Sequence, residues 1–87
     1  MDKIRLQIVT PEATVYDGMA AYAELPLENG SVGVLANHAP LIGAVTDGTV
    51  LTKGESGEVR ITVGLGVVSV ANNVITLLTR SAAKCEE

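Results

Sequence analysis

At 87 residues the chain is long enough for one small domain and too short for two separate cores. Its formal net charge is −4 and its six Lys and Arg residues are scattered, so we expect no nucleic-acid partner. The single cysteine, Cys85, excludes an internal disulfide. No stretch reaches the roughly 20 consecutive apolar residues of a membrane helix, so we expect membrane contact only through a partner.

The first residues are typical of strands. Ile4–Ile8 alternates apolar and polar side chains, which indicates a half-buried strand. A turn at residues 9–12 follows, and residues 13–16 can re-enter the sheet. Asp17-Gly18 then predicts a second turn.

The segment from Ala20 to Leu27 has two competing interpretations. Its odd positions are apolar, which favours a strand, and Pro26 suggests a sheet edge or the end of that strand. Helix is the alternative for residues 19–25, because alanine is a good helix former. The alternation and the adjacent proline favour the strand.

The stretch from Leu27 to Ile42 is the hardest to explain as plain strand sequence. It contains the only histidine, His38, and its glycines 30 and 33 interrupt an apolar run, so the backbone turns or approaches a neighbour closely there. Pro40 fixes the exit from this stretch. Short strands are predicted at Val32–Leu35 and Leu41–Val45.

The second half of the chain alternates strands and turns. Asp47-Gly48 predicts a hairpin between residues 43–45 and 49–52. Residues 53–57 form a polar, glycine-rich hairpin tip. Residues 58–63 then alternate, and the residues expected to point inward are Val59, Ile61 and Val63.

Asparagine and glycine mark the last turns. Gly64 and Gly66 predict a bulge or a tight corner. Asn72-Asn73 suits a two-residue turn with positive φ between strands at 67–71 and 74–79. Residues 81–84 are predicted to begin a helix that ends after about one turn.

These elements together predict an all-β fold, a flattened sandwich or barrel of about ten short strands with no substantial helix. We expect residues 1–83 to form this one domain and residues 84–87 to be a short charged tail.

The residues do not predict a catalytic centre. His38 has no partner motif for nucleophilic catalysis, and one histidine with one terminal cysteine cannot supply a zinc site. Gly30 and Gly33 lack the lysine and helix start of a phosphate-binding loop. The chain is therefore expected to be a binding or structural module without metal, cofactor or nucleotide.

The order of motifs resembles the epsilon subunit of F-type ATP synthases. The resemblance runs from residue 4 to about 83, nearly the whole chain. It rests on these segments: 6–12 (LQIVTPE), 16–18 (YDG), 28–41 (ENGSVGVLANHAPL), 47–48 (DG), 64–70 (GLGVVSV) and 73–78 (NVITLL).

The resemblance implies a ten-stranded β-sandwich at the foot of a rotor. Such a domain is a non-catalytic central-stalk subunit that couples the gamma subunit to the membrane c-ring during proton-driven ATP synthesis. It implies a peripheral position at the cytoplasmic face of a bacterial inner membrane, with the chloroplast thylakoid as the alternative. The residues implied to contact the c-ring are Glu28, Asn29, Gly30, Ser31 and Val32. Those implied to contact gamma are His38, Leu41, Ile42 and Gly43, with Thr10 a weaker candidate.

The chain departs from the family pattern twice. Ser31 occupies a loop position where many relatives carry an acidic residue, and Glu28 and Asn29 are its nearest polar substitutes. The usual relative continues into two C-terminal helices that can inhibit ATP hydrolysis, whereas this chain stops at Glu87. We therefore expect inhibition by that route to be unavailable to this polypeptide.

Two other classes of function remain open from the sequence. One is a free-standing β-sandwich adaptor that grips a protein partner by strand-edge or loop contacts. The other is a small jelly-roll enzyme built on His38, which the missing ligands disfavour. The rotor interpretation also predicts exposed apolar surface beside His38, because Val32, Val34, Leu35, Leu41 and Ile42 lie so close together.

Overall fold

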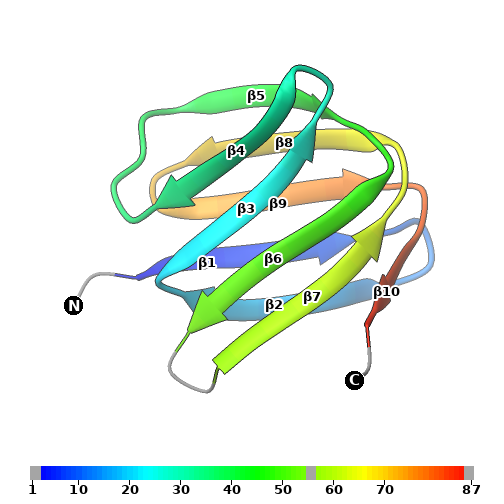
Figure 1. Cartoon of the computed structure of the whole chain (residues 1–87), viewed down its shortest axis with the longest axis horizontal. Helices are drawn as coiled ribbons and strands as arrows, with labels where there is room; N and C mark the ends of the chain where they lie inside the picture. Colours follow the sequence, from blue (N-terminus) through cyan, green and yellow to red (C-terminus); the bar gives the residue numbers. More distant parts are fainter. Residues whose placement is uncertain (1–2, 55–56, 86–87) are drawn as a thin grey trace.

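The computed structural model describes residues 3–54 and 57–85, which form ten strands and no helix (Figure 1). Among these residues no helix is long and apolar enough to cross a membrane. The strands are β1 (Ile4–Val9), β2 (Thr14–Ala20), β3 (Tyr22–Leu27), β4 (Gly30–Leu35), β5 (Leu41–Val45), β6 (Gly48–Gly54), β7 (Gly57–Val63), β8 (Gly66–Ala71), β9 (Val74–Thr79) and β10 (Ala82–Lys84).

The strands form one continuous sheet that folds over on itself. Their order is β10-β7-β6-β3-β5-β8-β9-β1-β2, and β4 pairs with β3. All pairs are antiparallel except β1 with β9. In Figure 1 the layer with β3, β4, β6 and β7 lies over the layer with β5, β8, β9, β1 and β2. The predicted all-β, flattened sandwich is confirmed.

The core between the layers is aliphatic, because each strand turns alternate side chains inward. In β1 the buried positions are Ile4, Leu6 and Ile8, as the sequence predicted. In β7, Ile61 and Val63 are buried and Val59 packs against the cluster from a half-buried position. The other large side chains that are fully buried are Leu25, Val34, Val45, Val50, Val68, Val70, Ile75 and Leu77.

Asp17-Gly18 does not form the predicted turn. Both residues lie inside β2, where Asp17 is opposite Gln7 and Gly18 is opposite Leu6. The side chain of Tyr16 covers the open side of Gly18, with its hydroxyl oxygen 3.1 Å from where a Cβ would stand. The Arg5 side chain binds Asp17 across the strands. Tertiary pairing therefore overrides the local turn signal.

Asp47-Gly48 does not close a hairpin either. β5 and β6 are not paired with each other, because each follows a different stretch of the same edge of β3. The chain changes layer between them, where the Thr46 N–H donates to the carbonyl oxygen of Pro26 (3.0 Å). Pro26 is the penultimate residue of β3, which agrees with a proline near a strand end.

The helix predicted at residues 81–84 is wrong. Ala82–Lys84 is β10, which pairs antiparallel with β7. The Cys85 N–H continues the pairing by donating to the carbonyl oxygen of Arg60 (2.8 Å). Pairing with the edge of β7 gives the backbone of residues 82–84 hydrogen bonds, whereas a single isolated turn of helix is unfavourable. The alternative helix at 19–25 is also excluded, since these residues belong to β2 and β3 apart from a bend at Ala21 between the two strands.

Two predicted turns are confirmed. Asn72 and Asn73 join β8 to β9 with φ of 52° and 62°. At the corner between β7 and β8, Gly66 lies so close to the backbone of Leu78 on β9 that a Cβ there would clash with the carbonyl oxygen of Leu78. The predicted hairpin between β6 and β7 is closed by the pair Gly54–Gly57, although residues 55–56 of its tip lie outside the described residues.

The Arg5–Asp17 pair predicts a small dependence of stability on pH. The guanidinium donates to both carboxylate oxygens (2.9 and 2.8 Å), and this hydrogen bonding lowers the pKa of Asp17 below its usual value. Because its pKa is lower in the folded state, Asp17 stabilises the fold at pH values above its unfolded-state pKa of about 3.9. This stabilisation is lost as the pH falls through the folded-state pKa of Asp17. We expect Asp17→Asn to unfold slightly earlier in urea than the parent at neutral pH, and the difference to shrink in acid. A difference that stays constant with pH would show that the ion pair is not its source.

Candidate functional site

An apolar row crosses the outer face of the layer formed by β5, β8, β9 and β1. Its members stand directly opposite one another on neighbouring strands: Ala44, Val67, Leu78 and Val9. Val67 is 51% and Leu78 49% exposed, so these side chains leave apolar surface in water. Burial of such surface by a partner is favourable in proportion to the area removed from water. We call these four residues the apolar row.

A groove of about 380 Å³ lies along this row and is lined by three of its four members, all except Ala44. It is bounded by the ends of β1 and β9 and by the β7–β8 corner, where Leu65 is half exposed. Thr10 is one of its residues and is held in a turn, because its N–H donates to the carbonyl oxygen of Ala13 (2.9 Å). The full lining is Val9, Thr10, Pro11, Leu65, Gly66, Val67, Leu78, Thr79 and Arg80.

β5 divides the residues expected to contact gamma between its two faces. Ile42 points outward, next to the apolar row, and is 83% exposed. Leu41 packs against the core, and a Cβ on Gly43 would lie 3.3 Å from Leu27. Only Ile42 of these three therefore presents a side chain on the outer face.

The loop between β4 and β5 carries His38. The His38 N–H donates to the carbonyl oxygen of Leu35 (3.2 Å), and its Nδ1 lies 2.6 Å from the carbonyl oxygen of Ala39. Exposed apolar side chains flank the loop at Leu35 and Ile42. Of the five residues expected to form apolar surface beside His38, Leu35 and Ile42 are exposed and Val34 is buried. The other two, Val32 and Leu41, pack against the core from half-buried positions. In residues 3–54 and 57–85, no group of three or more acidic, His or Cys residues is placed to hold a metal ion.

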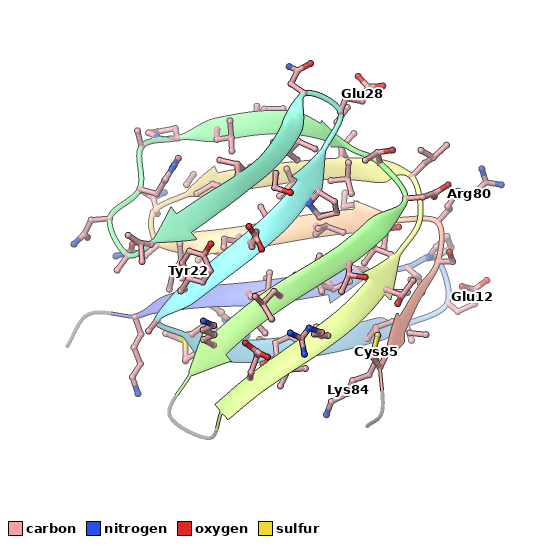
Figure 2. All side chains as sticks on the ribbon, viewed as in Figure 1. Glu12, Tyr22, Glu28, Arg80, Lys84 and Cys85 are labelled. Atoms are coloured by element: carbon pink, nitrogen blue, oxygen red, sulfur yellow. The ribbon has the colours of Figure 1, made fainter. Side chains whose placement is uncertain are left out.

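The residues expected to contact a c-ring lie around the β3–β4 turn. Glu28 is at its tip and projects away from the sandwich (Figure 2). The Glu28 N–H donates to the carbonyl oxygen of Ala44 (3.1 Å), which ties the turn to β5. Gly30 adopts a φ of 116°, Ser31 is exposed, and Val32 is half buried against the core.

β4 separates this turn from the His38 loop. Its six residues run from one to the other, a span of about 20 Å at the usual rise per residue. The turn and His38 therefore sit at opposite ends of β4 (Figure 1), whereas β5 runs back from the His38 loop and brings Gly43 next to Leu27 at the base of the turn. The structure places Ile42 beside the apolar row, just after the loop that carries His38, and places Thr10 in the groove.

The sequence reasoning did not single out Val67, Leu78 or Leu65. A signal for the first two was present in the doubled apolar positions Val67-Val68 and Leu77-Leu78. A half-buried strand needs an apolar side chain only at every second position. A doubled position therefore indicates apolar surface on both faces, but its alignment across strands follows only from the register.

Comparison with known proteins identifies the group to which this sandwich belongs. The sequence pattern described as "ATP synthase, Delta/Epsilon chain, beta-sandwich domain" matches residues 3–84. The chain belongs to this family. The match covers every strand of the fold, including β10, which the sequence reasoning had assigned to a helix and a tail.

Individual relatives agree with this assignment. The ATP synthase epsilon chain of Lawsonia intracellularis is 32% identical over 84 residues, which are 97% of this chain and 63% of the relative. The chloroplastic ATP synthase epsilon chain of Cyanidioschyzon merolae is 34% identical over 97% of this chain and 64% of the relative. The chain therefore spans about six-tenths of the length of these curated relatives.

A solved structure shares the fold. A chain in the cryo-EM structure of the Euglena gracilis mitochondrial ATP synthase, OSCP/F1/c-ring in rotational state 1, superposes with a TM-score of 0.87. Its sequence identity is 20%, and the match covers 94% of this chain and 53% of that chain. Family membership does not favour the free-standing adaptor.

Proposed function

We propose that this domain belongs to a non-catalytic central-stalk subunit of an F-type ATP synthase and couples the gamma subunit to the c-ring during proton-driven ATP synthesis. The observation that carries the proposal is the apolar row with its groove, on a sandwich of the ATP synthase delta/epsilon family. A rotor element needs a stiff body with separate contact surfaces. A close-packed aliphatic core between paired sheet layers provides that stiffness.

The gamma side comprises the apolar row, Ile42, Thr10 and His38. A standard interface buries about 800 Å² on each partner and has an apolar centre with a polar rim. The row and Ile42 supply the centre, while Thr10 and His38 belong to its rim. Leu41 and Gly43 act from the interior, since they set the position of β5 from which Ile42 projects.

The c-ring side is the β3–β4 turn, from Glu28 to Val32. Polar groups at an exposed tip suit contact with the polar loops of a membrane ring, and Val32 anchors the turn in the core. Glu28 supplies the negative charge of this turn, because Ser31 is neutral. No metal, cofactor or nucleotide takes part on this proposal. The subunit lies peripherally at the cytoplasmic face of a bacterial inner membrane, or at a thylakoid membrane if the source is a chloroplast.

The test is the binding of the purified chain to purified gamma and to detergent-solubilised c-ring carrying gamma. We expect a stable complex with gamma. We also expect the chain to be retained on the c-ring that carries gamma. Failure to bind gamma would overturn the proposal. A free-standing adaptor would bind neither of them.

Reversing the charge of the turn should affect one interface only. Glu28→Lys is expected to weaken retention on the gamma–ring assembly by up to about tenfold, because exposed charge contacts contribute modestly and this one changes sign. Its affinity for isolated gamma should stay unchanged. Glu24→Lys, at a partly exposed position of β3 in the layer that does not carry the apolar row, is the control with the same change in net charge and should leave ring retention intact. Equal losses in both variants would point to net charge rather than to the turn.

A further inference from the structure

The side chain of Asn73 joins two parts of the fold that are distant in sequence. The Asn37 N–H donates to Asn73 Oδ1, and Asn73 Nδ2 donates to Asn37 Oδ1 (3.1 Å), a separation of 36 residues. The carbonyl oxygen of Asn73 also accepts from the Arg5 N–H (3.0 Å). One residue of the β8–β9 turn is thus bonded to the start of β1 and to the loop that carries His38.

The loop needs such a restraint. Asn37 adopts a φ of 67°, in the left-handed region that most residues avoid, and it immediately precedes His38. The loop also leads directly into β5, where Ile42 projects from the outer face. Movement of residues 37–40 would therefore displace His38 and loosen the start of β5.

We propose that Asn73 is a positioning residue that holds the His38 loop in the conformation that gamma binds. This inference rests on the proposed function for its partner, and on the paired Asn73–Asn37 hydrogen bonds for its mechanism. A loop that is already ordered loses less conformational entropy when it docks, so the same contacts give a tighter complex. Asn73 itself makes no contact with gamma on this proposal.

The turn offers a matched pair of variants. Asn72 and Asn73 both have positive φ, so glycine satisfies the backbone at either position. Asn73→Gly removes the two side-chain hydrogen bonds to Asn37, whereas Asn72→Gly makes the same replacement at a residue outside this pair. We expect Asn73→Gly to weaken gamma binding about three- to tenfold, the usual effect of losing one net hydrogen bond, and Asn72→Gly to match the parent within about twofold.

Two readouts separate positioning from a general loss of stability. Both glycine variants should be fully folded at the temperature of the binding measurement, and hydrogen exchange at the Asn37 amide should be faster only in Asn73→Gly. Asn73→Asp keeps an acceptor for the Asn37 N–H and loses the donor to Asn37 Oδ1, so we expect it to bind gamma with intermediate affinity.

The outcomes distinguish this inference from the proposed function. If the parent binds gamma and Asn73→Gly binds it equally well, the positioning role is wrong and the proposed function stands. If the loss of affinity of Asn73→Gly is fully accounted for by the fraction of the variant that is unfolded at the binding temperature, the role is merely structural and the inference also fails. If the parent does not bind gamma, the proposed function fails. An unchanged hydrogen-exchange rate at the Asn37 amide in Asn73→Gly would show in addition that Asn73 does not restrain the loop.

Discussion

Val67→Asp should reduce the affinity for gamma by at least about 100-fold, equivalent to roughly 2.7 kcal/mol. Val67 is the member of the apolar row on β8, between Ala44 and Leu78. A carboxylate there would be taken out of water in the complex, in the middle of an apolar row, and burying a charge in such surroundings is costly. Titration of gamma with the purified variant measures the effect directly.

The fold should tolerate this change, because Val67 is half exposed in the free domain. Exchanging a β-branched residue for aspartate on a strand costs about 1 kcal/mol or less in the free energy of unfolding. Thr49→Asp is the matched control: it also replaces a β-branched residue, at an exposed position of β6 in the other layer. Thr49→Asp should bind gamma normally. A Val67→Asp domain that remains folded and keeps its affinity would show that gamma docks elsewhere.

Leu77→Ala should destabilise the domain by about 2–5 kcal/mol, the range for truncating a buried leucine. Leu77 is completely buried in the shared core, on a strand with partners on both sides. A small domain has only about 5–15 kcal/mol of net stability, so this loss removes a large part of it. Urea unfolding followed by far-ultraviolet circular dichroism provides the free energy.

Leu78→Ala is the neighbouring comparison, with the same residue type and the same substitution one position along β9. Leu78 is 49% exposed and points to the outer face, so its truncation should cost less than about 1 kcal/mol of stability. It should, however, weaken gamma binding, since Leu78 belongs to the apolar row. The pair thus separates core packing from partner contact, and equal losses of stability in both variants would contradict the assignment of faces.

The candidate site was predictable only in part. The unusual stretch around Gly30 and His38 was visible in the sequence and forms exposed connections at the two ends of β4. Ile42 was named, and it is the most exposed of the large apolar side chains in the described part of the chain. The apolar row was missed, because Val9, Ala44, Val67 and Leu78 become neighbours only through the register of β1, β5, β8 and β9.

By itself the sequence determined the class of fold, most strand positions, the inward faces of β1 and β7 and the Asn72-Asn73 turn. These features depend on alternation with a period of two and on local backbone preferences, which each segment carries within itself. The tertiary structure decided how the strands pair: Asp17-Gly18 stays extended, Asp47-Gly48 turns a corner between layers, and residues 82–84 complete the edge of β7. Strand pairing depends on which distant edges are free to form hydrogen bonds, and a local pattern holds no information about those edges.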